Sequence, residues 1–140
     1  MSTALTAPAA AVRRWPAWTT AAVLTLTAVI HIAAGTGDYL SAVDRSGLAG
    51  EARGLAIALW HLTSVLLILL AVAVFWAARQ TAAVGRPILV AVWLICLAFV
   101  VIMLGVDLAS GGVIEPLMQW TLFAPGMALL PLARLPHTDT

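Results

Sequence analysis

Two histidines lie inside long apolar runs of the sequence, and they are the residues best suited to chemistry. His31 lies near the end of the first run, on one helical face with Thr27 and Gly35, and His61 lies six residues into the second. Ionisable residues inside membrane segments are rare and mark functional sites by default. An imidazole can carry a proton near neutral pH or bind a metal. We expect His31 and His61 to be proton carriers. The alternative is that the two histidines bind haem b or a single transition metal.

Carboxyl and amide side chains occur at a comparable depth in the other two apolar runs. Asp107 ends the third run, and Glu115 and Gln119 are one helical turn apart at the start of the fourth. A carboxylate beside an imidazole can share its proton and give or take it near neutral pH. We therefore expect Asp107 and Glu115 to be charge partners of the histidines and catalytic if the protein is an enzyme. Gln119 would orient a ligand.

Aromatic side chains flank these polar residues. Trp60 precedes His61, and Trp120 follows Gln119. Asp38, which follows the first run, adds a further polar group that could bind a ligand. Tryptophans near the ends of apolar runs are typical of the aromatic belt of membrane proteins, but they also suit the walls of a site for a flat ligand. The sequence therefore predicts a polar pocket that binds a small lipophilic ligand. Acid–base isomerase or cyclase chemistry on that ligand stays open.

Four apolar runs must position these residues. They cover about residues 18–35, 55–78, 87–106 and 116–135, and each is close to the roughly 20 residues that a membrane-spanning helix needs. Backbone groups cannot stay unpaired in lipid, so the runs should be helices. The sequence predicts an all-α integral membrane protein, a single four-helix bundle of up-down-up-down order over residues 18–135. Residues 1–17 and 136–140 would be tails.

Glycine and proline predict where these helices end. Gly35 and the residues that follow it should end the first helix, and the long connection 35–53 should be a loop over the pocket. Pro87 and Pro116 suit the first turn of a helix, where a missing N–H costs nothing. Pro125 lies inside the fourth run and should kink it.

Composition and charge set the class and the orientation. Hydrophobic residues make up 63% of the 140 residues and charged residues 9%, which excludes an ordinary soluble domain, and the near-neutral charge excludes a nucleic-acid partner. One side of the predicted bundle holds five arginines and one aspartate, and the other holds two arginines and five carboxylates. Positive residues favour the cytoplasmic side. We therefore expect both termini in the cytoplasm and the protein in the plasma membrane.

Other functions fit the same architecture. A small bundle has a thin interior, so a homo-oligomer or an accessory subunit beside a partner membrane subunit is an alternative. The length and predicted topology are similar to those of the small multidrug-resistance exporters, which would imply transport. Those exporters rely on a glutamate in their first helix, and His31 is the sole ionisable residue of the first run here.

Overall fold

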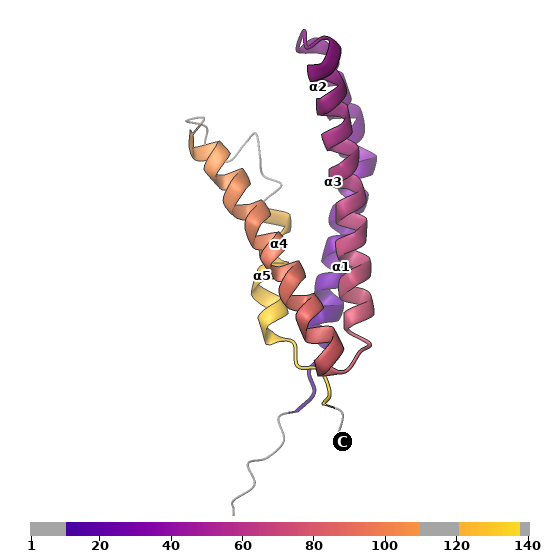
Figure 1. Ribbon diagram of the computed structural model, residues 1–140, viewed down its shortest axis with the longest axis vertical. Coiled ribbons are helices and arrows are strands. Elements are labelled where there is room, and N and C mark those ends of the chain that lie inside the picture. Colours follow the sequence, from indigo (N-terminus) through magenta and orange to yellow (C-terminus); the bar gives the residue numbers. More distant parts are fainter. Residues whose placement is uncertain (1–10, 110–120, 138–140) are drawn as a thin grey trace, which may run out of the picture.

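Long apolar helices dominate the fold. The computed structural model describes residues 11–109 and 121–137, which contain helices and no strand. Three helical stretches are long and apolar enough to cross a membrane: Trp15–Arg45, Gly50–Ala77 and Ala82–Ala109 (Figure 1). The described residues therefore confirm the all-α class, and the three helices agree with a membrane protein. The fourth span and the orientation stay predictions.

The first spanning helix is longer than the sequence predicts. Helix α1 (Trp15–Ile30) passes through one π-helical turn, η1 (His31–Gly35), into α2 (Thr36–Arg45). The predicted end at Gly35 is wrong, and so is the predicted loop over residues 35–53, because most of that segment is helix. Glycine ends a helix by adopting a positive φ. Among the described glycines, Gly47 and Gly50 adopt one, at 73° and 55°, so the chain turns there.

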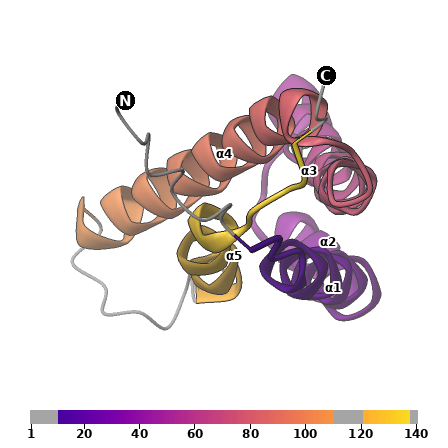
Figure 2. The same ribbon diagram turned by 90° about the horizontal axis from the view of Figure 1, so that it is seen from below.

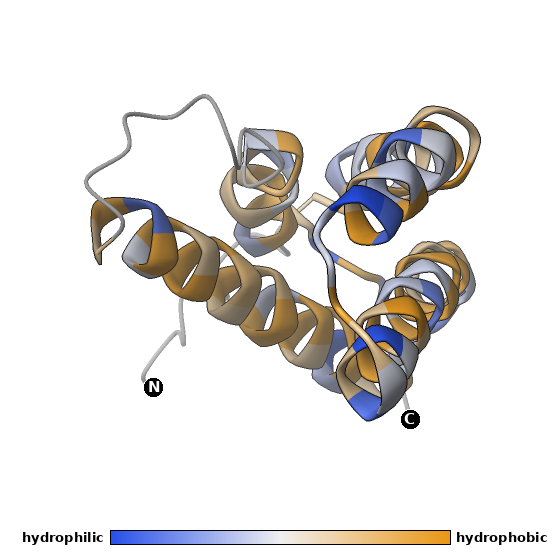
Figure 3. Ribbon diagram, turned by 90° about the horizontal axis from the view of Figure 1, so that it is seen from above, coloured by the Kyte–Doolittle hydropathy of each residue, from blue (hydrophilic) through white to orange (hydrophobic). Residues whose placement is uncertain are grey.

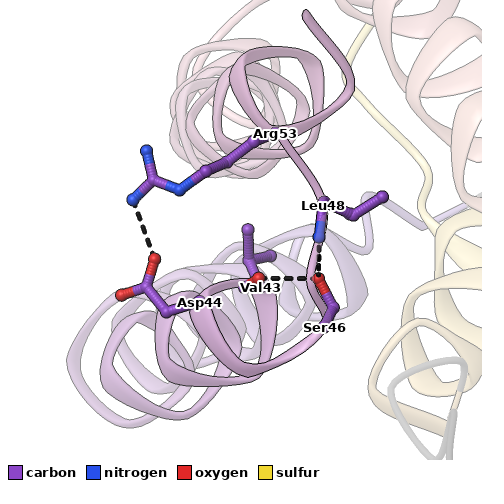
Figure 4. Close-up of polar contacts among 5 residues, drawn as sticks. All are labelled: Val43, Asp44, Ser46, Leu48 and Arg53. Carbon is purple, nitrogen blue, oxygen red and sulfur yellow. Dashed lines mark hydrogen bonds and ion pairs between the residues drawn. The ribbon is translucent and has the colours of Figure 1, made fainter. Parts of the chain in front are cut away.

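A tight turn joins α2 to α3 (Gly50–Ala77). The Ser46 hydroxyl donates a hydrogen bond to the Val43 carbonyl at 2.6 Å, and Arg53 forms an ion pair with Asp44 at 2.8 Å (Figure 4). The stretch Trp15–Arg45 has 31 residues, so it is about 46 Å long, against about 30 Å for a bilayer core. This stretch is therefore longer than a bilayer core is thick, and hydrophilic residues gather at the end where α2 meets α3 (Figure 3).

Small side chains hold α1 against α3. Ala17, Ala21, Leu24 and Ala28 recur at helical spacing on α1 and are all buried in one core cluster. Small residues let two helix backbones approach closely, which is how helices associate in membranes. Their partners on α3 are also buried: Leu67, Leu70, Ala71 and Val74. The two helices α1 and α3 thus share much of the buried core.

Helix α4 (Ala82–Ala109) packs on α3 near its start and leans away from α1 and α3 toward its end (Figure 1). It begins five residues before Pro87, so Pro87 lies inside the helix and the predicted start is wrong. The close packing is at Gly85, where an added Cβ would lie 2.6 Å from the Ala77 carbonyl oxygen. Most residues of α4 are apolar (Figure 3), and large apolar side chains such as Leu94, Ile102 and Leu108 are exposed.

The described C-terminal segment is a broken helix. It contains α5 (Ala124–Leu129) and the 3₁₀ turn η3 (Leu130–Leu132). Pro125 lies in the first turn of α5, so it begins a short helix instead of kinking a long one. Helix α5 lies between α1 and α4 (Figure 2). Beyond η3 the chain pairs with the segment before α1, where Arg13 and Arg134 exchange two backbone hydrogen bonds of 2.8 Å.

Candidate functional site

Three aromatic rings stack where α1 passes into α2. The indole of Trp60, on α3, lies nearly parallel to the imidazole of His31 and to the phenol ring of Tyr39. The ring centroids are 3.8 Å apart for His31 and 4.4 Å apart for Tyr39, with interplanar angles of 22° and 12°. His31 and Tyr39 lie on either side of Gly35 along the helix, so the indole fits between them. Trp60 is therefore held by rings from a neighbouring helix.

Gly35 is what allows the indole to enter. A Cβ at Gly35 would lie 2.7 Å from Cη2 and 2.9 Å from Cζ2 of Trp60, closer than carbon atoms approach. The indole Nε1–H donates to the Thr36 hydroxyl at 3.2 Å, and the Tyr39 hydroxyl donates to the Ala56 carbonyl at 3.3 Å. The π-helical turn over His31–Gly35 leads into this contact, and such turns are frequent at functional sites.

A cavity of about 190 Å³ lies beside the stack. It is lined by residues of the first long helical stretch around His31, of α3 from Trp60 to Leu67, and of α4 near Phe99. Its apolar side includes the stacked rings of Phe99 and Phe123, whose centroids are 5.0 Å apart. The complete lining comprises Thr27, Ile30, His31, Ala34, Gly35, Asp38, Trp60, Thr63, Leu67, Phe99, Met103, Leu122 and Phe123. The cavity is thus mostly apolar with a few polar groups, which is the usual composition of a small-molecule site.

The polar groups of the lining are not fully used by the protein. Thr27 and Thr63 donate their hydroxyl protons to the Val23 and Leu59 carbonyls of their own helices, so their oxygens are left as acceptors. The Nε2 atom of His31 is buried and has no hydrogen-bond partner among the described residues. An unpaired buried polar atom costs about 1–3 kcal/mol. The oxygens of Thr27 and Thr63 therefore offer a ligand hydrogen-bond acceptors in the same cavity wall as the imidazole of His31.

A second buried polar group lies above the cavity on α4. Asp107 is 3% exposed, and its Oδ2 atom has no hydrogen-bond partner among the described residues. It follows Met103, which lines the cavity, by one helical turn. Asp38 lines the cavity itself and is exposed to solvent. The structure therefore provides one imidazole and one carboxylate in the cavity wall and a buried carboxylate one turn beyond it.

The structure separates the two histidines that the sequence suggests as a pair. His61 follows Trp60 on α3, is exposed, and does not line the cavity. Neighbouring positions on a helix point about 100° apart, so with Trp60 turned toward α1, His61 points elsewhere. Within the described ranges, no group of three or more His, Cys, Asp or Glu side chains could hold a metal ion. Glu115, Gln119 and Trp120 lie outside the described residues.

Sequence reasoning placed His31, Trp60 and Asp38 in the pocket and Thr27 on the same face as His31, but it gave no role to several other residues of the site. Tyr39 and Phe99 carry aromatic contacts, and Thr27 and Thr63 carry hydroxyls. One available pattern was the spacing of four that relates Thr27, His31 and Gly35, since it continues to Tyr39. The two phenylalanines could not be found in this way, because they come from separate elements.

Comparison with protein-family models, curated proteins and solved structures finds no match to this chain. The fold and the cavity define its class: a small helical protein with three helices that could cross a membrane and a mostly apolar cavity among them.

Proposed function

We propose that the protein binds a small lipophilic ligand in the cavity beside His31 and Trp60. The observation that carries this proposal is the imidazole of His31 in the wall of an otherwise mostly apolar cavity. Polar groups inside membrane proteins are expensive and are retained where they function. A ligand that brings one hydrogen-bonding oxygen into an apolar cavity would match this arrangement.

The cavity volume limits the ligand. An engineered apolar cavity of about 150 Å³ in another protein holds a benzene molecule, so about 190 Å³ accommodates one substituted ring. A complete sterol would not fit. The ligand class is therefore a single-ring molecule with a hydroxyl or carbonyl oxygen, or the ring end of a larger lipid whose tail lies outside the cavity.

Two probes of nearly equal size test this proposal. Fluorobenzene and 4-fluorophenol differ by a hydroxyl, and their binding to the detergent-solubilised protein can be followed by fluorine NMR. We expect 4-fluorophenol to bind about fivefold more tightly, the equivalent of one net hydrogen bond of about 1 kcal/mol. His31→Phe keeps a ring in the stack and should abolish the preference. His61→Phe is the matched control and should keep it, because His61 does not line the cavity.

The same binding measurements can also refute the proposal. Equal binding of both probes to the unaltered protein would mean that the cavity recognises apolar surface alone. A preference that survives His31→Phe would assign the hydrogen bond to another residue. Absence of binding by either probe would refute the proposed ligand class.

Proton transfer is the second candidate function, and the shared lining by His31 and Asp38 favours it. An exposed carboxylate can exchange protons with water and stabilise a nearby imidazolium ion. Bound 4-nitrophenol reports this step, because its anion absorbs visible light. We expect the deprotonated fraction of the bound dye to be lower in His31→Phe than in the unaltered protein. The fraction should fall less strongly in Asp38→Asn. Bound dye that stays protonated in the unaltered protein would exclude His31 as a base.

A further inference from the structure

The end of the bundle where α1 and α4 begin is basic. Among the described residues, every carboxylate lies at the opposite end: Asp38 and Asp44 on α2, Glu51 in the first turn of α3, and Asp107 near the end of α4. The basic end holds the following side chains: Arg13, Arg14, Arg79, Arg86 and Arg134. No described acid neutralises these arginines, so this end attracts anions.

A groove of about 640 Å³ opens at this basic end, between the first turns of α4 and residues 130–137. Arg86 and Arg134 border it, and the rest of its lining is mainly apolar and includes Leu89, Val90 and Trp93. Trp93 follows Arg86 by seven residues, which corresponds to about 10 Å along the helix. The groove therefore has charge near the start of α4 and apolar surface deeper in the bundle.

The two arginines of the groove are not engaged by other side chains. Both are exposed, and among the described residues an ion pair is found only between Arg53 and Asp44, at the other end. Arg79 differs, because its guanidinium lies 3.9 Å from the Phe75 ring centroid. The Nε1–H of Trp93 donates to the Met127 carbonyl at 3.0 Å, so its ring offers the groove apolar surface and no free donor.

We propose that this groove binds one anionic phospholipid. Its phosphate would lie between Arg86 and Arg134, and an acyl chain would follow Leu89, Val90 and Trp93. Guanidinium groups bind phosphate oxygens in a bidentate manner, and basic pockets between transmembrane helices bind anionic head groups. A free phosphate ion would leave the apolar part of the groove empty. A second copy related by a twofold axis along the membrane normal would bring like-charged ends together, which opposes a dimer here.

The test is native mass spectrometry of the full chain, titrated with dioleoyl phosphatidylglycerol or dioleoyl phosphatidylcholine. These lipids have the same acyl chains and differ in their head groups, because glycerol leaves the lipid anionic whereas choline makes it zwitterionic. We expect tighter binding of phosphatidylglycerol, and about a fivefold loss for Arg86→Gln or Arg134→Gln. Arg45→Gln, at the other end of the bundle, is the matched control and should not change binding. Arg86→Lys keeps the charge and should retain most of the affinity.

A substitution in the apolar part distinguishes a lipid from a phosphate ion. Ala133 lines the groove, so Ala133→Trp should reduce phosphatidylglycerol binding while both arginines remain. Equal affinity for the two lipids, or no effect of the arginine substitutions, would overturn the proposal. Displacement of the lipid by equimolar glycerol 3-phosphate would also overturn it, because a phosphate site would then need no acyl chain. A dimer that blocks lipid binding would assign the groove to a second copy.

Discussion

Replacing Gly35 with alanine should destabilise the protein, although alanine normally favours a helix. Alanine stabilises a helix interior by about 1 kcal/mol relative to glycine. At Gly35, however, the added Cβ would lie 2.7 Å from Cη2 of Trp60. The indole would have to leave its position, because it is held between two stacked rings and cannot yield at one edge alone. Gly35→Ala therefore acts on the aromatic stack.

The structure gives the size of the effect. Displacing the indole would break its stacking with His31 and with Tyr39, each worth about 0.5–1.5 kcal/mol. It would also break the hydrogen bond to Thr36, worth about 1 kcal/mol. These losses total about 2–4 kcal/mol. After subtracting the helix gain of about 1 kcal/mol, we expect the free energy of unfolding to fall by about 1–3 kcal/mol.

Gly37 is the matched control, since it lies two residues further along the same helix. A Cβ at Gly37 would meet nothing within 4 Å, so Gly37→Ala should be neutral or stabilise by up to about 1 kcal/mol. The assay is equilibrium unfolding in mixed micelles of dodecyl sulfate, together with near-ultraviolet circular dichroism, which reports the packing of Trp60. Trp60→Leu should remove the penalty of Gly35→Ala. Equal shifts for the two glycines, or a penalty that persists without Trp60, would refute the proposed clash.

Three further predictions concern other contacts. Gly85→Ala should lower the free energy of unfolding by about 1–3 kcal/mol, because its Cβ would lie 2.6 Å from a backbone oxygen. Gly105→Ala on the same helix is the control and should cause no such loss, since its Cβ would meet nothing within 4 Å. A similar loss at both sites in micelle unfolding would contradict the close approach. Arg53→Gln should change the same free energy by less than about 1 kcal/mol, because its ion pair is exposed; a larger loss would show that the pair orders the hairpin. Cys96 is 0% exposed, so maleimide labelling should become fast only on unfolding, and rapid labelling of the folded protein would place the thiol at an accessible surface.

The sequence predicted the apolar spans better than their ends. Apolar length is sufficient to identify a membrane helix, and three of the four expected runs correspond to helices that could cross a membrane. The end predicted at Gly35 failed because glycine there serves a close helix contact with Trp60 and not a turn. That distinction depends on a residue 25 positions away in the sequence, so local patterns cannot reveal it.

The sequence predicted how far along its helix each histidine lies, but not which way its side chain points. His31 and His61 lie at comparable depths, as their positions in the apolar runs suggested, yet only His31 lines the cavity. A uniformly apolar helix has no polar face from which its rotation can be inferred. In the structure, α3 turns Trp60 toward Gly35 and leaves His61 exposed. The predicted pairing of His31 with His61 depended on the rotation of α3 about its axis, which the sequence does not reveal.

The cavity beside His31 and the basic groove both adjoin the broken C-terminal helix. Helix α5 fills the space between α1 and α4 over only six residues. Residues just before it line the cavity beside His31, and residues from its end onward line the basic groove. Pro125 and Pro131 each lie in the first turn of a new short helical segment, because proline lacks the N–H that would continue the preceding one. The cavity and the basic groove therefore lie on either side of α5, where the short helical segments begin and end.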